Sequence, residues 1–347
     1  MRKARIQKII LDGYGSILRM EKGCYVVQST EEKEIKKYPV FDAEIGEVVL
    51  KSGNTVTVGV LASLGFWEID TMIMTRRGKP VAMLKSLEYD SHVKTRLCQY
   101  EAYNNDKAFY IAKQIVTAKI RGQNTVLMKY GLETIHSRME DFEDRVNHIK
   151  TDNLMLLRKK LLAIEYQYTK NYFNQIFQLF PKWLKPEVRR TWKAYDGLNN
   201  TFNLAYEILK WKVQIALIKA KVEPYLGFLH SLQRSMPSMV CDFQELYRYL
   251  IDNFLIAYCK ELRKKDFTIK MMNFSNKRKG KRQFLRDSKA KVLVDSLYKY
   301  FTRIVEIPRI RRGQRQRIET LINEEALLFA KYLRGERETW IPRVVVF

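Results

Sequence analysis

The sequence has few cysteines. Its four cysteines, Cys24, Cys98, Cys241 and Cys259, form no C-x-x-C pair, which argues against a disulfide scaffold, a zinc finger or an iron–sulfur site. No run of about 18 apolar residues predicts a membrane-spanning helix, and the basic start leads into no apolar signal segment. Glycine-rich nucleotide motifs and G-x-S-x-G are also absent, so nucleotide hydrolysis and serine chemistry lack support. We therefore expect a cytoplasmic protein without a membrane partner.

Positive charge is abundant and unevenly distributed. The 347 residues include 63 Lys and Arg against 38 Asp and Glu, a net charge of +25. Residues 1–90 hold 14 basic and 12 acidic residues, so nearly all the excess lies in 91–347; the densest stretch, 263–317, has 19 basic and 4 acidic residues. A solvated face is the simple interpretation, but the asymmetry favours a surface that contacts the phosphates of a polyanion. The side chains that we expect on this phosphate-contacting surface are Lys277, Arg278, Lys279, Lys281, Arg282, Arg311 and Arg312.

Hydrophobic patterning predicts an α+β protein. Short β-prone runs separated by turns in residues 1–90 are typical of a small β-sandwich, although 57–66 could instead be a helix packed on the sheet. From residue 91 the pattern becomes helical, which predicts a larger all-helical, basic domain over 91–347. We expect residues 266–292 to be irregular and basic. The predicted helices span 93–103, 108–120, 123–130, 153–180, 203–220, 237–264 and 314–335.

Glu165 is the first candidate for chemistry. It falls inside an apolar stripe that includes Leu161 and Tyr168 at helical spacing. A carboxylate there must be paired, protonated or bound to a metal, because desolvating a free charge costs several kcal/mol. From this position alone, an ion pair with a nearby Lys or Arg is as good an interpretation as a metal.

A second set of polar residues surrounds His230. This histidine ends an apolar run, where a histidine is more often a satisfied core residue than a ligand. Asp242 and Glu245 follow, and they share one face if the segment after Pro237 is helical. A histidine with carboxylates suits Mg²⁺ or Mn²⁺, with Zn²⁺ as an alternative.

A third polar segment stands where a helix is expected to begin. Asp196 is a candidate N-cap. Asn203 and Tyr206, one turn apart, could face the same site as His230.

Three motifs occur in order between about residues 160 and 250. Glu165 is followed seven and eight residues later by paired aromatics, Tyr172 and Phe173. The spacing D-x-x-N-x-x-x-N-x-x-Y follows at Asp196, Asn199, Asn203 and Tyr206. The string P-Y-L-G-F-L-H occupies 224–230, and after P-S comes D-x-x-E at Asp242 and Glu245.

Together these motifs resemble the CRISPR-associated integrases of spacer acquisition, the Cas1 endonuclease family. Two features depart from the family pattern. Larger residues, Tyr166, Gln167 and Thr169, stand where small ones usually surround the glutamate, and Tyr249 stands where a proline is usual.

The resemblance implies a metal site made by Glu165, His230 and Glu245, with Asp242 beside it and Mg²⁺ or Mn²⁺ as the ion. It also implies a role in antiviral defence, a homodimer formed through the β domain, and a small ferredoxin-like partner, Cas2. The substrate would be a short DNA duplex whose 3′-hydroxyl ends are joined into a CRISPR repeat beside its leader. The reaction is a phosphodiester transesterification, which a divalent ion can promote, with His230 neutral and acting as a ligand.

Two alternatives remain open from the sequence. One is a non-catalytic DNA-binding scaffold, in which Glu165 makes a structural ion pair. The other is a transposon-borne integrase of the same superfamily, which acts on transposon ends without the small partner.

Overall fold

The computed structural model divides the chain into two compact units, residues 1–92 and 93–347. The structure describes residues 7–30, 34–40, 45–76, 79–85, 93–133, 136–275, 278–306 and 315–347. The predicted domain boundary after residue 90 lies outside these described residues. In the described part, no helix is both long and apolar enough to cross a membrane.

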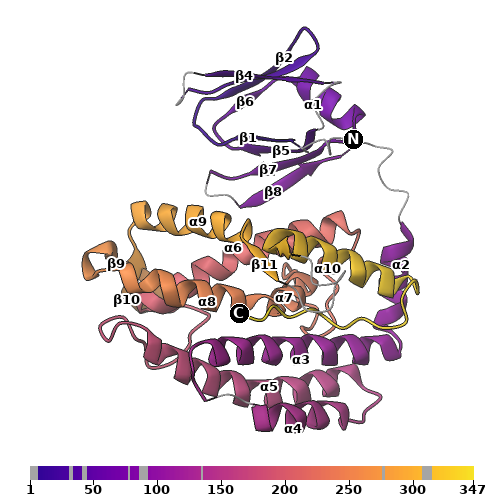
Figure 1. Ribbon diagram of the computed structural model, residues 1–347, viewed down its shortest axis with the longest axis vertical. Helices are drawn as coiled ribbons and strands as arrows, with labels where there is room; N and C mark the ends of the chain where they lie inside the picture. Colours follow the sequence, from indigo (N-terminus) through magenta and orange to yellow (C-terminus); the bar gives the residue numbers. More distant parts are fainter. Residues whose placement is uncertain are drawn as a thin grey trace. The chain divides into compact units, whose positions relative to one another are not determined.

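The first unit is built from two four-stranded sheets and one helix (Figure 1). One sheet has the order β1-β5-β7-β8 and the other β4-β3-β2-β6. The elements are β1 (Gln7–Leu11), β2 (Ile17–Glu21), β3 (Cys24–Gln28), β4 (Ile35–Pro39), β5 (Ile45–Lys51), β6 (Thr55–Val56), α1 (Val58–Phe66), β7 (Asp70–Met74) and β8 (Pro80–Leu84).

Both sheets of this unit contribute to one core. Leu18 and Tyr25 of one sheet and Val48 and Leu50 of the other belong to the same buried cluster, which confirms the β-rich N-terminal fold. The segment that the sequence left undecided is a helix, α1, which lies in the connection between β5 and β7. These strands pair in parallel, and a parallel pair requires such a crossover.

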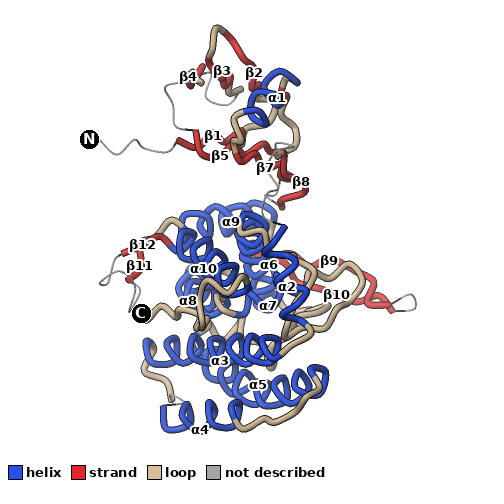
Figure 2. The backbone as a smooth tube through the Cα atoms, turned by 90° about the vertical axis from the view of Figure 1, so that its right-hand side faces the viewer, coloured by secondary structure: helices blue, strands red, loops and turns tan. Residues whose placement is uncertain are grey.

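The second unit is mainly helical. Its elements are α2 (Val93–Tyr103), α3 (Asp106–Lys129), α4 (His136–Asn147), α5 (Leu154–Ile176), α6 (Gly197–Lys219), α7 (Ser238–Glu245), α8 (Arg248–Tyr258), β9 (Phe267–Ser275), β10 (Arg278–Leu285), α9 (Asp287–Phe301), β11 (Ile304–Glu306), β12 (Arg315–Arg317) and α10 (Ile318–Leu333). Helix α3 packs against α5 on one side and against α7 and α8 on the other, while α6 covers α7 and α8 (Figures 1 and 2).

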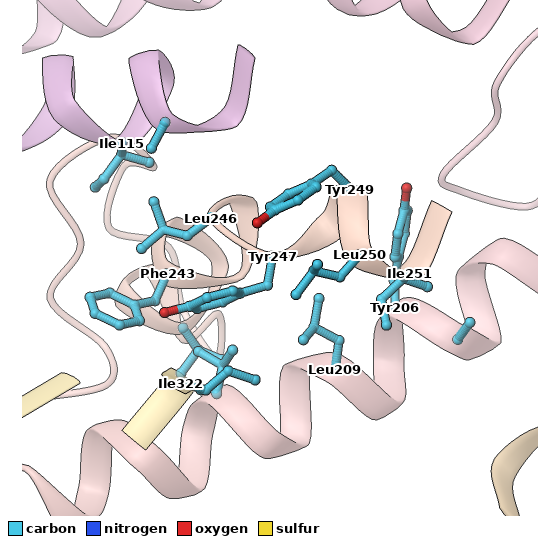
Figure 3. Close-up of a cluster of buried hydrophobic side chains, with 14 of the residues drawn as sticks. Ile115, Tyr206, Leu209, Phe243, Leu246, Tyr247, Tyr249, Leu250, Ile251 and Ile322 are labelled. Carbon is cyan, nitrogen blue, oxygen red and sulfur yellow. The ribbon is translucent and has the colours of Figure 1, made fainter. Parts of the chain in front are cut away.

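A dense apolar cluster fixes α7 and α8 between their neighbours. Figure 3 shows Phe243, Leu246 and Leu250 from this pair lying between Ile115 of α3 and Leu209 of α6. All five side chains are essentially inaccessible to solvent. Because burial of each such side chain contributes about 1.5–3 kcal/mol, the cluster holds the end of α7 firmly in place.

Two predicted helices, 108–120 and 123–130, form the single helix α3. Gly122 lies between the two predicted ranges, inside the continuous helix, and it meets a packing demand there. A Cβ built on Gly122 would lie 2.4 Å from a ring atom of Tyr249, so only glycine lets α8 approach α3 this closely. The same ring explains the departure at Tyr249: its hydroxyl accepts a hydrogen bond from the backbone N–H of Val345, at 2.7 Å, and so helps to hold the C-terminal segment.

Other boundaries also differ from the prediction. The helix expected over 237–264 is divided at Leu246–Tyr247 into α7 and α8, and the last helix begins at Ile318. The stretch expected to be irregular forms the antiparallel hairpin β9–β10, and β11 pairs with β12, so the second unit is not entirely helical. From Phe267 to Met271 in β9 the apolar residues alternate with polar ones, which is the strand period rather than the helical one.

Candidate active site

The predicted site residues come from three separate parts of the second unit. Glu165 lies in α5, His230 lies in the loop between α6 and α7, and Asp242 and Glu245 lie in α7. Helix α3 packs against both α5 and α7. The site is therefore assembled by tertiary packing around α3.

Asp242 organises the loop that carries His230. Its fully buried carboxylate accepts hydrogen bonds from the backbone N–H groups of Phe228 (2.6 Å), Leu229 (2.8 Å) and His230 (2.8 Å). It also lies 2.7 Å from Nδ1 of the His230 ring. Both carboxylate oxygens are thus used within the protein, so Asp242 positions His230.

Gly227 allows the loop to fold onto the start of α7. A Cβ at this position would lie 2.7 Å from the carbonyl carbon of Ser238 and 2.8 Å from Oδ2 of Asp242. The Gly227 N–H donates to the Ser238 hydroxyl at 2.9 Å, while Arg158 donates to the carbonyl oxygens of Gly227 and Phe228. The backbone of the string P-Y-L-G-F-L-H is therefore fixed from both sides.

His230 presents one ring nitrogen away from Asp242. Because an ionised carboxylate can only accept a hydrogen bond, Nδ1 is the donor in this contact. In the neutral ring the lone pair is therefore on Nε2. Burial lowers the pKa of the imidazole, but the hydrogen bond and the charge of Asp242 outweigh that effect and raise it. Carboxylate–histidine pairs of this kind orient the ring of metal-binding histidines.

The two glutamates meet at Lys119 of α3. Its Nζ lies 2.6 Å from Oε1 of Glu165 and 2.7 Å from Oε2 of Glu245. The Thr169 hydroxyl also donates to Oε1 of Glu165, at 2.5 Å. The ion pair that the sequence left open for Glu165 is therefore present, and its partner is Lys119.

Arg248 is the second cation at Glu245. Its guanidinium lies 2.9 Å from Oε1, on the oxygen opposite to the one that faces Lys119. Burial raises the pKa of Glu245, but the charges of Arg248 and Lys119 outweigh it and bring the pKa to about 2. Burial lowers the pKa of Lys119, yet Glu245 and Glu165 raise it above its ordinary value. Both groups are ionised at neutral pH.

The donor set fits a hard divalent cation in its chemistry. Two carboxylates and a neutral imidazole nitrogen are the ligands that Mg²⁺ and Mn²⁺ accept. Oε2 of Glu245 is buried and, although Lys119 is close, it receives no well-directed hydrogen bond. As the described side chains stand, no three of the His, Cys, Asp and Glu residues are close enough to hold a metal, because Lys119 separates the glutamates.

Comparison with known proteins identifies the family of this chain. The family model "CRISPR associated protein Cas1" matches residues 9–289, most of the chain. The chain belongs to the Cas1 family. It is 25% identical over 268 residues to the CRISPR-associated endonuclease Cas1 of Korarchaeum cryptofilum, covering 73% of this chain and 77% of the relative.

Solved structures share the fold across the whole chain. A partial Cas6-RT-Cas1–Cas2 complex contains a chain with a TM-score of 0.71 and 18% identity, covering 97% of this chain and 98% of that one. A casposase bound to an integration product matches with a TM-score of 0.65 and 18% identity, covering 96% and 97%.

The residues of the motif D-x-x-N-x-x-x-N-x-x-Y lie at the start of α6, where its two asparagines and its tyrosine contact Arg189. Asp196 is an N-cap, as expected: its Oδ1 accepts from the Asn199 N–H at 2.7 Å. Asn199 and Asn203 accept hydrogen bonds from Arg189, at 2.9 and 2.7 Å, and Arg189 lies over the ring of Tyr206.

Tyr206 connects this motif to the glutamates. Its ring lies 5.0 Å from the Arg248 guanidinium, and its hydroxyl donates to the buried carboxylate of Asp252. Tyr172, the first of the paired aromatics after Glu165, donates to the other oxygen of Asp252 at 2.8 Å. Asn203 and Tyr206 therefore reach the site through Arg189 and Arg248, and their hydrogen bonds within the described part of the chain go to residues other than His230.

The structure describes the side chains of only some of the predicted DNA-binding residues. Lys277, Arg311 and Arg312 lie outside the described residues, and for Arg278 and Lys279 the backbone belongs to β10 while the side chains are not described. Lys281 is exposed on β10. Arg282 instead donates to the Ala194 carbonyl at 2.7 Å and to Oδ1 of Asn200 at 3.1 Å, so it ties the hairpin to α6. DNA contact by this surface stays a prediction.

Sequence reasoning missed Lys119 and Arg248. Lys119 lies within a largely apolar stretch from Ile115 to Ile120. A charged residue inside an apolar stripe is also the feature that makes Glu165 a candidate. Arg248 stands three residues after Glu245, a spacing that joins neighbours on a helical face, even though the helix axis changes between them.

A basic and aromatic loop was also missed. Between η2 (Phe177–Leu179) and α6, Trp192 is 76% exposed, with the Lys193 ammonium 4.0 Å from its ring centroid. Close by in sequence, the Arg190 guanidinium lies 4.5 Å from the ring of Tyr195. These residues stand before the Asp196 motif, and their aromatic–basic pairing was the available signal.

Proposed function

We propose that this chain is a divalent-metal-dependent DNA integrase and endonuclease of CRISPR adaptation. It would join the 3′-hydroxyl ends of short DNA fragments into the CRISPR array. The supporting observation is the convergence of Glu165 and Glu245, from α5 and α7, at one buried point, beside a loop whose histidine is oriented by Asp242. The Cas1 family membership and the basic charge of residues 91–347 support the same conclusion.

Glu165, His230 and Glu245 would hold the ion. When bound, Mg²⁺ or Mn²⁺ would polarise the scissile phosphate and lower the pKa of the attacking oxygen. The reaction exchanges one phosphodiester for another: a 3′-oxygen attacks phosphorus, and a different 3′-oxygen leaves.

This chain's own residues prepare that chemistry. Asp242 accepts a hydrogen bond from Nδ1 of His230, so the neutral ring is oriented with Nε2 available as a ligand, and an Nε2 that holds a metal could not act as a general base. Arg248 stays on Oε1 of Glu245 and keeps that carboxylate ionised, while the buried surroundings exclude competing water. The residues thereby supply orientation and charge before substrate arrives.

The DNA surface would include the loop before α6 and the hairpin β9–β10. Exposed aromatic rings with cations beside them, as at Trp192 with Lys193 and Tyr195 with Arg190, offer stacking faces for bases together with phosphate contacts. Lys281 would extend the phosphate contacts along β10.

We infer further that the chain works in an assembly. The fold matches a chain of a Cas6-RT-Cas1–Cas2 complex, which supports the small Cas2 protein as a partner. A homodimer through the nearly neutral first unit completes this proposal, because a unit of small net charge repels its copy weakly. A transposon-borne integrase is the second candidate, since a casposase shares the fold.

A strand-transfer assay tests this function. The purified chain, with and without Cas2, is mixed with a labelled duplex bearing 3′-hydroxyl ends and a supercoiled plasmid carrying a repeat and leader, in Mn²⁺, Mg²⁺ or EDTA. His230→Ala is compared with His148→Ala, whose exposed ring contacts the Asp144 carbonyl four residues before it.

We expect labelled plasmid to form only in the presence of the metal. His230→Ala should lose this joining while its DNA affinity barely changes, and His148→Ala should retain it. Joining that needs no metal would refute the proposed chemistry. Joining of transposon ends without Cas2 or repeat would favour the second candidate. Tight DNA binding without any joined product would indicate the non-catalytic scaffold.

A further inference from the structure

Lys119 occupies the point at which the two glutamates meet. It lies near the middle of α3, its side chain is only 11% exposed, and its helix neighbours Ile115, Val116 and Ile120 are fully buried. A single ammonium group bridges a carboxylate of α5 and a carboxylate of α7. Such a position is costly for a lysine unless the charge is matched, so the lysine is held there by the glutamates.

The charges at this point already balance. Glu165 and Glu245 carry two negative charges, and Lys119 and Arg248 carry two positive ones. The hydroxyl of Thr169, which also bonds to Glu165, is neutral. A divalent ion added among these four groups would bring two further positive charges to a poorly solvated place, which favours the departure of a cation already bound to the carboxylates.

The two resident cations differ in how they bind. Arg248 contacts Oε1 of Glu245, whereas Lys119 contacts Oε2 of the same residue and Oε1 of Glu165. Lys119 therefore contacts one carboxylate oxygen from α5 and one from α7 and bridges the two helices. An ammonium on a flexible four-carbon stem can withdraw, whereas a planar guanidinium is held more rigidly.

We propose that Lys119 is an exchangeable internal cation of this site. In the metal-free protein it neutralises Glu165 and Glu245 and holds α5 and α7 together at α3. When a divalent ion binds to the two glutamates, Lys119 withdraws, so the ammonium and the ion compete for the same oxygens. This inference rests on the proposed function, because it takes Glu165 and Glu245 as metal ligands.

Substitution of Lys119 by methionine tests the competition. Methionine keeps the length and the apolar stem but carries no charge. Binding of Mn²⁺ to the full chain is measured from the electron paramagnetic resonance signal of free Mn²⁺, and thermal unfolding is followed in EDTA and in saturating Mn²⁺. The matched control is Lys113→Met on the same helix, whose ammonium bonds to the carbonyls of Asn147 and Ile149.

We expect Lys119→Met to bind Mn²⁺ at least tenfold more tightly than the unaltered protein, about 1.4 kcal/mol. We also expect a lower unfolding temperature in EDTA that Mn²⁺ restores, because without the ion the two carboxylates would have only the charge of Arg248 to balance them. Lys113→Met should bind Mn²⁺ as the unaltered protein does. Unchanged or weaker Mn²⁺ binding by Lys119→Met would overturn the proposal.

The unaltered protein offers a second test if the variant does not fold. Brief amine acetylation followed by mass spectrometry measures the accessibility of each lysine in EDTA and in Mn²⁺. Lys119 should be protected in EDTA and become modified severalfold faster in Mn²⁺, while Lys113 should not change. Equal modification of Lys119 in both conditions would overturn the proposal.

The outcomes separate this inference from the proposed function. If joining is metal-dependent but Mn²⁺ affinity and Lys119 labelling do not respond as expected, the function stands and the exchange fails. If neither protein binds Mn²⁺ and labelling is unchanged, both fail. If only Lys119→Met binds Mn²⁺, Lys119 blocks the glutamates without being exchanged, so both the exchange and the metal dependence of the unaltered protein are refuted.

Discussion

Replacement of Asp242 by asparagine would test how the His230 loop is held. Asparagine has the same shape, but one of its two polar atoms is an NH₂ donor. The carboxylate accepts two N–H groups on each oxygen, those of Phe228 and Leu229 on Oδ2 and the backbone and ring donors of His230 on Oδ1. Whichever way the amide is turned, its NH₂ group must face two N–H donors.

The structure sets the expected size of this effect. Asp242 is completely buried, so water cannot replace the missing acceptor without a rearrangement of the loop. A buried donor left without a partner costs about 1–3 kcal/mol, which gives a decrease of about 2–6 kcal/mol in the free energy of unfolding for two donors. Without the fixed Nδ1 hydrogen bond, the ring of His230 is free to turn, so joining should also decrease.

Urea unfolding followed by tryptophan fluorescence measures the change, because four of the five tryptophans lie in residues 93–347. The matched control is Asp196→Asn, since asparagine caps a helix about as well as aspartate and the expected change is small. A free energy of unfolding for Asp242→Asn within about 0.5 kcal/mol of the unaltered protein would refute the reasoning. The loop would then be held by other interactions.

Three other predictions concern different parts of the molecule. Burial raises the pKa of Asp252 from 3.8 to about 6, so the stabilising contribution of this carboxyl group is complete below pH 4 and is lost as the pH rises through 6. Between pH 4 and pH 7, the free energy of urea unfolding of Asp252→Asn should therefore rise by about 2–3 kcal/mol relative to that of the unaltered protein. A difference between the two proteins that stays constant with pH would contradict this. Gly122→Ala should cost about 1–3 kcal/mol because its methyl group meets the Tyr249 ring, and Tyr249→Leu in the same chain should recover part of that stability in thermal unfolding; two strictly additive effects would count against the steric clash. Replacing Lys279 and Lys281 with glutamine should make the fall of log DNA affinity with log salt shallower by about 0.9 for each phosphate that is no longer neutralised, and an unchanged slope would mean that this part of β10 is a solvated face.

The N-terminal fold and the order of the site residues could be predicted from local information. Short β-prone runs with turns indicated the β-rich first unit, and helical spacing indicated the larger second unit. Asp196 was recognisable as an N-cap because capping depends on neighbours three residues away. The candidate residues Glu165, His230 and Glu245 came from motifs whose spacing is visible along the chain.

Boundaries that depend on contacts between distant segments were not predictable. The sequence predicts separate helices over 108–120 and 123–130, but α3 runs through both ranges, and the ring of Tyr249, far along the chain, packs against Gly122 between them. The β9–β10 hairpin was expected to be irregular, since its strand alternation is weak beside its high charge. In both cases a tertiary or cross-strand partner outweighed the local signal.

The sequence by itself determined which residue types are available to the site and where they stand along the chain. Only the tertiary structure decided their roles. Asp242 and Glu245 share one helix, yet Asp242 faces the backbone of the His230 loop while Glu245 faces Lys119 and Arg248. Lys119 is 46 residues before Glu165 and much further from Glu245, so no local pattern could join them. Burial beside α3 makes that joining necessary, because carboxylates removed from water require a cation, and packing determines which cation reaches them.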